Sequence, residues 1–172
     1  ALPISAVTAI DANGQRYSTA GNDVGGFAIN DAPPGQYTLF ADAPGYAREF
    51  VGDTTVGTGE TRVQFTMSPE AVVRGTLDLP PGGPTGGVVL VSAVSVAAPD
   101  DLSQRYTAQS DGTAANFELG GLPAGEYVIE VRKVGYAAFQ TTVVVAAEQT
   151  LDLGSIAVAP FATERRHQIA FG

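Results

Sequence analysis

The chain contains one sequence pattern twice, and this repetition constrains the fold more than any other feature. The equivalent residues include Phe27 and Phe117, Gly35 and Gly125, Tyr37 and Tyr127, and Tyr46 and Tyr136. The separation is constant, because 117 − 27, 125 − 35, 127 − 37 and 136 − 46 all equal 90. Self-similarity at a fixed period indicates two structural units built to the same plan.

The repeat divides the 172 residues into two small domains and a tail. We expect a first domain over residues 1–69, a second over residues 70–160, and a C-terminal tail over residues 161–172. Each domain is small but long enough to close a hydrophobic core. The short junction around Pro69 predicts that the two domains lie end to end.

Short alternating or β-branched runs fill both copies, and Gly, Pro, Asn and Asp separate them, which is typical of an all-β chain. The second copy has predicted strands at 72–79, 88–96, 105–109, 115–119, 125–134, 138–146 and 150–158. The first copy has predicted strands at 4–10, 15–19, 26–29, 35–43, 47–51 and 61–67. Turns at this spacing predict Greek-key sandwiches, and the first copy lacks the opening strand of the second.

Both copies carry a proline, glycine and tyrosine element after a Phe-x-Leu/Ile pair. The element is Pro33-Pro34-Gly35-Gln36-Tyr37 in the first copy and Pro123-Ala124-Gly125-Glu126-Tyr127 in the second. The prolines fix the approach of the chain and the glycine permits a turn. We expect each tyrosine to enter a strand, with its hydroxyl free to bond the backbone at the corner.

This element, followed by a Gly-Tyr pair, resembles the pattern of the carboxypeptidase regulatory-like domain family. The resemblance covers nearly the whole chain and implies two Ig-like, transthyretin-like β-sandwiches. The family pattern opens with an Ile/Val-x-Gly-x-Val strand, which the second copy has as Val73-Arg74-Gly75-Thr76-Leu77. The first copy starts at the following strand. Because such domains occur in many kinds of protein, the resemblance implies a fold and leaves the function to be argued from sites.

The missing strand predicts a groove in the first domain. A sandwich without one strand exposes apolar side chains and unpaired backbone groups that another strand can satisfy. The strand at 4–10 is the predicted part of this acceptor groove, through Ile4, Ala6, Val7 and Ile10.

The tail has the character of the missing strand. Its residues Arg165, Arg166, Gln168, Ile169, Ala170 and Phe171 are the predicted donor segment. Ile169 and Phe171 alternate as the apolar side chains of a half-buried strand do. Donation of this tail to the first domain of the next subunit would form a head-to-tail fibre, because a heterologous contact propagates unless it closes into a ring. The predicted function is therefore a structural subunit of an extracellular, pilus-like filament, with the same chain as partner.

Three other interpretations stay open at the level of sequence. The tail can cap its own first domain, or it can be a disordered end or the start of a third repeat. The chain can instead be a ligand-binding or adhesin module whose loops contact a target. Finally, it can be an accessory domain of a larger secreted or surface protein.

Composition argues against several classes of function. Nine basic and eighteen acidic residues give a net charge of −9, which disfavours nucleic acid as a partner. The single histidine, His167, lies in the tail, and no pair of carboxylates stands out as an acid–base couple. We therefore expect no enzymatic activity, no cofactor and no metal site. No run of about 18 apolar residues is present, so no membrane span is expected, and the start at Ala1 fits a secreted protein after removal of a signal peptide.

Overall fold

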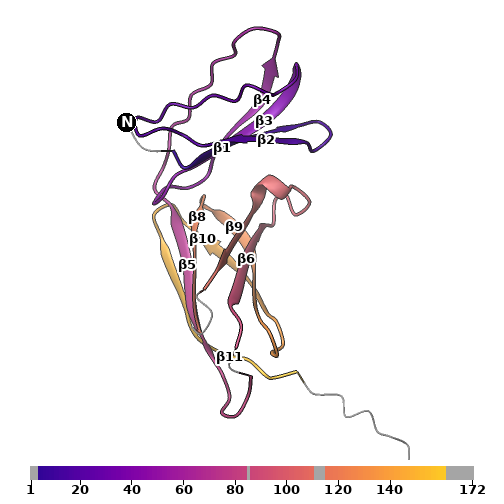
Figure 1. Cartoon of the computed structure of the whole chain (residues 1–172). Helices are drawn as coiled ribbons and strands as arrows, with labels where there is room; N and C mark the ends of the chain where they lie inside the picture. The colour runs from indigo at the N-terminus through magenta and orange to yellow at the C-terminus, as the bar shows by residue number, and fades with distance from the viewer. Residues whose placement is uncertain (1–3, 85, 111–114, 162–172) are drawn as a thin grey trace, which may run out of the picture.

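The computed structural model describes residues 4–84, 86–110 and 115–161, and these residues form an almost purely β structure (Figure 1). The first unit contains one four-stranded antiparallel sheet in the order β2-β1-β3-β4. Its strands are β1 (Ala6–Asp11), β2 (Arg16–Thr19), β3 (Gly35–Asp42) and β4 (Glu49–Val56).

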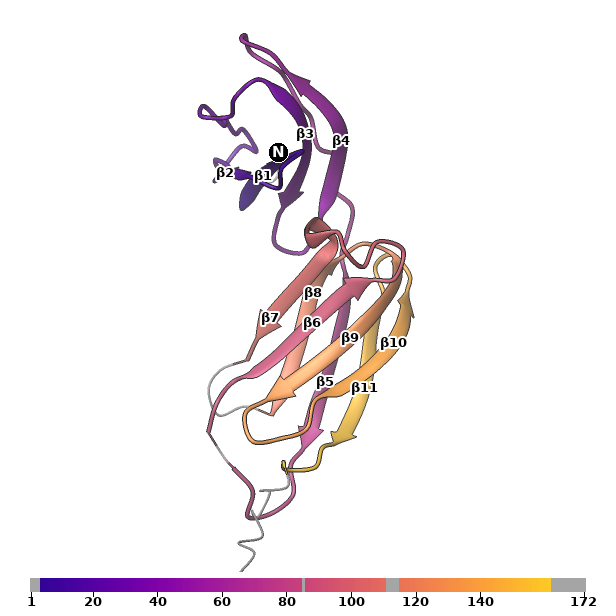
Figure 2. The same cartoon turned by 90° about the vertical axis from the view of Figure 1, so that its right-hand side faces the viewer.

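The second unit is a sandwich of two sheets, which Figure 2 shows as two layers of strands. One sheet has the order β10-β9-β6-β7, and the other has the order β11-β5-β8. The strands are β5 (Ala71–Asp78), β6 (Val89–Ser95), β7 (Arg105–Gln109), β8 (Asn116–Leu122), β9 (Gly125–Lys133), β10 (Phe139–Val145) and β11 (Thr150–Ala157), and the short 3-10 helix η1 spans Leu102–Gln104. The predicted strands of the second copy are therefore confirmed, and the chain consists of two tandem β units, of which the second is a two-sheet sandwich.

The four-stranded sheets of the two units are equivalent strand by strand. The offset of 90 relates β3 and β4 to β9 and β10. Because β1 pairs with β2 and β3 as β6 pairs with β7 and β9, the orders β2-β1-β3-β4 and β7-β6-β9-β10 are the same. The second sheet has no such counterpart in the first unit. The predicted strands at 26–29 and 61–67 are wrong, since neither segment is a strand in the structure. Their counterparts, β8 and β11, both pair with β5, which the first unit lacks.

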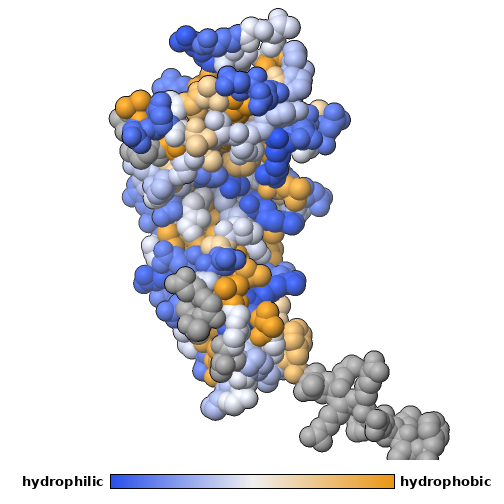
Figure 3. All heavy atoms as spheres, viewed as in Figure 1, coloured by the Kyte–Doolittle hydropathy of each residue, from blue (hydrophilic) through white to orange (hydrophobic). Residues whose placement is uncertain are grey.

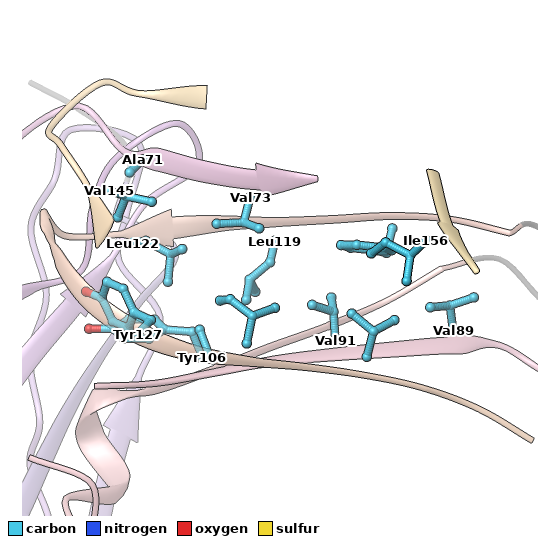
Figure 4. Packing of buried hydrophobic residues seen from close by; sticks show 14 of the residues in the cluster. Ala71, Val73, Val89, Val91, Tyr106, Leu119, Leu122, Tyr127, Val145 and Ile156 are labelled. Atoms are coloured by element: carbon cyan, nitrogen blue, oxygen red, sulfur yellow. The ribbon is translucent and has the colours of Figure 1, made fainter. Parts of the chain in front are cut away.

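The core of the second unit lies between its two sheets. Figure 4 shows side chains from both sheets pointing toward one another across this layer, among them Val73, Leu119 and Leu122 from one sheet and Val91 and Tyr127 from the other. Inward residues alternate along β5, where Ala71, Val73 and Leu77 are buried, as expected for a strand with one face on a core. In the first unit a sheet covers the core on one side only.

The repeated tyrosines occupy equivalent places in the two cores. The hydroxyl of Tyr37 donates to the carbonyl oxygen of Pro33 at 2.5 Å, and that of Tyr127 donates to Pro123 at 2.8 Å. The ring of Tyr37 lies edge-on to Tyr17 at 6.0 Å, and the ring of Tyr127 lies edge-on to Tyr106 at 5.8 Å. The predicted bond between tyrosine and backbone at the corner is confirmed in both copies.

Arg48 joins the first unit to the second. Its guanidinium forms an ion pair with Asp42 at 2.8 Å and donates to the carbonyl oxygen of Ser103 at 2.9 Å. The same group lies over the rings of Phe40 and Tyr106, at 4.3 and 4.8 Å from their centroids. Because one side chain contacts both units through charge, hydrogen bonds and aromatic faces, it fixes their relative orientation.

The backbone strengthens this joint beside β5. The amide of Arg48 donates to the carbonyl of Gly121 at 2.9 Å, and the amide of Gly121 donates to the Glu70 carboxylate at 2.6 Å. β5 therefore begins at the joint and runs away from the first unit, as Figures 1 and 2 show. β11 is parallel to β5, so the described chain ends at the far end of the second unit.

Candidate functional site

An open groove lies beside the sheet of the first unit. Its volume is about 710 Å³. Phe27, Ile29 and Ala32 line one side, and the segment 61–63 lines the other. The sheet contributes lining residues from three strands, namely Ala9, Tyr37, Leu39, Thr54 and Val56. Figure 3 shows apolar residues at the surface of this first unit, among polar ones.

The backbone on both sides of the groove is unpaired. Within the part of the chain that the structure describes, no N–H or C=O group of residues 27–32 or 57–67 forms a hydrogen bond with another backbone group. The side chains still alternate as in strands. Phe27, Ile29, Val63, Phe65 and Met67 are half-buried, and all of their direct neighbours except Gly26 are exposed. The two segments thus have the side-chain pattern of strands but lack a neighbouring strand. A strand inserted between them could form hydrogen bonds with their N–H and C=O groups.

The second unit shows what occupies the equivalent space. There β5 lies between β8, to which it is antiparallel, and β11, to which it is parallel. Subtraction of 90 relates β8 to the segment 26–32 and the start of β11 to the segment 60–63. The groove of the first unit therefore has the position that β5 holds in the second unit.

The acceptor residues predicted from sequence lie on or beside β1, which is an inner strand. β1 pairs with β2 along one edge and with β3 along the other, so it has no free edge for a further strand. Ile4 and Val7 belong to the core cluster beneath the groove, together with Phe27 and Ile29. Ala6 and Ile10 are half-buried and lie outside that cluster.

The predicted donor residues, Arg165, Arg166, Gln168, Ile169, Ala170 and Phe171, lie outside the described residues. The point from which the tail departs is described. Tyr136 forms an isolated bridge with Pro160, as Tyr46 does with Pro69 at the end of the first unit. After Pro69 the chain enters β5, so residues 162–172 occupy the sequence position of an opening strand.

The sequence does not identify the two segments that border the groove as its borders. These unpaired segments are 26–32 and 61–67, and the sequence predicts strands at 26–29 and 61–67. Their apolar alternation was visible, but alternation does not say which strand is the neighbour. The repeat offset held the missing signal, because it relates both segments to strands that flank the same opening strand.

The groove has little charge along its length. Arg62 and Glu60 form an exposed ion pair at 2.8 Å between these two side chains. Across residues 4–84, 86–110 and 115–161, no group of three or more His, Cys, Asp or Glu side chains could hold a metal ion. Over the same residues, no helix is long and apolar enough to cross a membrane. The groove therefore offers apolar contacts and backbone pairing rather than a set of ligands or catalytic groups.

Solved structures with some likeness to this chain have low sequence identity to it. The minor pilin GBS52 of Streptococcus agalactiae is 13% identical, with a TM-score of 0.38, and the match covers 94% of this chain and 84% of that chain. A variant of BcpA, the major pilin subunit of Bacillus cereus, is 14% identical, with a TM-score of 0.38, and the match covers 91% of this chain and 60% of that chain. These values establish no common function.

A type II cohesin-X-dockerin complex from Acetivibrio cellulolyticus gives a shorter match. It is 14% identical with a TM-score of 0.36, and the match covers 52% of this chain and 58% of that chain. This chain thus spans less than two thirds of that protein's length. No curated protein matches the chain significantly in sequence.

The family comparison concerns the unit that contains the groove. Residues 1–68 match the family described as the carboxypeptidase regulatory-like domain. The match includes the proline, glycine and tyrosine element and both borders of the groove. The resemblance found in the sequence is therefore confirmed for residues 1–68, which match the model of this family.

Proposed function

We propose that the chain is a structural subunit of an extracellular, pilus-like filament, in which the C-terminal tail of one subunit fills the groove of the next. The observation that carries the proposal is the groove itself, which has unpaired backbone on both sides and the position of a strand that the second unit possesses. The tail supplies a segment with the sequence position of that strand and with alternating apolar side chains.

Apolar burial and backbone pairing would both favour such a contact. Burial of Ile169 and Phe171 would contribute about 3 to 6 kcal/mol. About five ladder hydrogen bonds, at about 1 kcal/mol each, would add a similar amount. The loss of translational freedom and the ordering of the tail oppose these terms. Arg165 and Arg166 place positive charge on a tail that must find a subunit with net charge −9, which would favour encounter.

The geometry favours donation to another subunit over capping of the same one. Residues 162–172 span at most about 40 Å when fully extended. The tail begins at the far end of the second unit, and β11 alone, with eight residues, covers about 26 Å of that length. A tail that returned to its own first unit would have only about four residues left to fill the groove.

Electron microscopy with size-exclusion chromatography tests the proposal on the full chain and on a chain ending at Thr163. The full chain should form filaments or a ladder of oligomers, and the shortened chain should remain a monomer. A full-length chain with I169D and F171D should behave like the shortened chain, because charged side chains resist burial in the groove.

Val144→Asp is the matched control, because Val144 is an exposed apolar residue on β10, outside the groove. It should leave assembly unchanged, which separates insertion of the tail from general hydrophobic association. A monomeric full-length chain, or filaments that persist after removal of the tail, would contradict the proposed function.

A further inference from the structure

The opening strand of the second unit has a glycine where an aromatic ring crosses it. Gly75 of β5 pairs with Phe117 of β8, and a Cβ atom on Gly75 would lie 2.6 Å from Cζ of Phe117. No side chain can occupy that position unless the ring moves. In the first unit the equivalent ring is Phe27, since 117 − 90 is 27. A strand in the groove therefore cannot place a large side chain opposite Phe27.

At one position beside the opening strand, the first unit has a smaller residue than the second unit. Ala71 of β5 pairs with Leu122 of β8, and both are fully buried. The counterpart of Leu122 is Ala32, which lines the groove. A strand with a small residue at this position would leave a void next to Ala32, because core residues pack to constant volume. The groove therefore favours a large aliphatic side chain opposite Ala32.

The charged residues that flank the opening strand of the second unit are not conserved at the equivalent positions of the first unit. Arg74 of β5 pairs with Glu118 of β8 and forms an ion pair with Asp152 of β11 at 3.3 Å. Subtraction of 90 gives Ala28 and Arg62 as the equivalent residues of the first unit. An arginine between them would lose both acidic partners and face a positive charge. The groove thus disfavours a strand like β5 and favours a residue without positive charge at that position.

We propose that the groove fixes the register of its donor by these three positions, with Ile169 opposite Ala32, Phe171 opposite Ile29 and Gly172 opposite Ala28. This register rests on the proposed function and names the partner as the tail of a second copy. It places the large Ile169 opposite Ala32, where the second unit has a leucine. It places Gly172 where a positive charge would be disfavoured. Phe171 then avoids Phe27.

The alternative registers fail for physical reasons. A shift that places Ile169 opposite Ile29 brings Phe171 against Phe27, where the complete unit tolerates only glycine. A shift that places Gly172 opposite Phe27 turns Gln168 toward the core, and a buried amide without a partner is costly. The groove therefore acts as a specificity determinant that disfavours β5-like strands. Insertion of β5 from a second unit into the groove of a first unit is thereby suppressed.

Disulfide trapping in the full chain tests this register, because the native sequence has no cysteine. A32C combined with I169C should convert the monomer band on a non-reducing gel into a ladder of covalent multimers, since cross-strand neighbours lie within disulfide reach. A28C combined with I169C is the matched control, because Ala28 is exposed on the other face of the same segment. I29C combined with I169C reports the shifted register.

The possible outcomes test the proposed register and the proposed head-to-tail assembly separately. A ladder from the 32–169 pair, with little product from the other pairs, supports both. A disulfide within single chains at 32–169 supports the register and overturns head-to-tail assembly. Faster trapping at 29–169 or 28–169 overturns the register, while filaments in the micrographs would still support the proposed function. No product from any pair overturns the register as well.

A size exchange provides a second measurement that needs no cysteine. A32L should raise the concentration at which half of the protein assembles by about tenfold, because the added side chain overfills the site of Ile169. I169A in the same chain should restore assembly to within about threefold of the native value, since the exchanged pair reproduces Ala71 and Leu122. Equal effects of A32L and A28L would contradict the register.

Discussion

Phe27 of the first unit and Phe117 of the second are equivalent residues in different environments. Phe117 retains 3% of its exposed area, lies over Gly75 of β5 and belongs to the core of a closed sandwich. Phe27 is only half-buried, and its ring packs against that of Phe65, with 5.7 Å between the centroids. The same segment is a paired strand in one unit and unpaired chain in the other.

The comparison shows that a strand depends on its neighbour as well as on its own sequence. Both units have the same four-stranded sheet, because all of its strands are present in each. The other layer forms only where β5 supplies hydrogen bonds to both sides. A single missing strand therefore leaves its two neighbours unpaired, and the groove between them has a defined partner chemistry.

Hydrogen exchange should show the largest difference between the units. In the chain ending at Thr163, amides of residues 27–32 and 61–67 should exchange faster than those of residues 117–122 and 151–156 by a factor on the order of a thousand, because only the latter pair with β5. Mass spectrometry resolved by peptide measures this ratio. In assembled full-length chain the difference should shrink, and equal protection in the shortened chain would contradict an empty groove.

Truncation of the equivalent rings should sharpen the comparison. Phe117→Ala should lower the free energy of unfolding of the second unit by about 3 to 5 kcal/mol, the cost of a large cavity in a core. Phe27→Ala should cost the first unit about 1 to 2 kcal/mol, since its side chain is only partly buried. Urea unfolding followed by hydrogen exchange assigns each transition to its unit, and equal costs would show that Phe27 is as deeply packed as Phe117.

A methyl group on the opening strand should disturb only the complete unit. Gly75→Ala should cost about 1 to 3 kcal/mol, because its Cβ would overlap the ring of Phe117. Gly52→Ala in β4 is the control, because a Cβ there meets nothing within 4 Å. The control should change stability by less than about 0.5 kcal/mol. Thermal unfolding of both variants measures the difference, and a neutral Gly75→Ala would remove the steric basis for the proposed register.

The joint between the units should contribute the smallest effect. Arg48→Ala should weaken the coupling of the two units by about 1 kcal/mol, because it removes the ion pair with Asp42 and the contacts with the second unit. Small-angle X-ray scattering should then report a broader distribution of lengths for the chain ending at Thr163. Arg62→Ala, which removes an exposed ion pair outside the joint, is the control. Unchanged scattering for Arg48→Ala would show that backbone bonds alone hold the joint.

Much of the fold followed from the sequence, and the candidate site followed in part. The repeat offset, the strands of the second copy and the corner tyrosines were predictable because turn chemistry and apolar alternation are local properties. The existence of a groove followed from comparison of the copies. Its borders did not, because the segments 26–32 and 61–67 look like strands whether or not a partner lies between them. The boundaries of the domains at 69 and 160 stay a prediction.

The sequence by itself determined that this protein is built from two copies of one β pattern and that the first copy lacks a strand. These properties depend on residue spacing, which the chain carries directly. Only the tertiary structure decided that β1 is closed on both edges and that the open edges are 26–32 and 61–67. Strand pairing joins residues far apart in the sequence, so the neighbour of a strand is set by the whole fold and not by the strand.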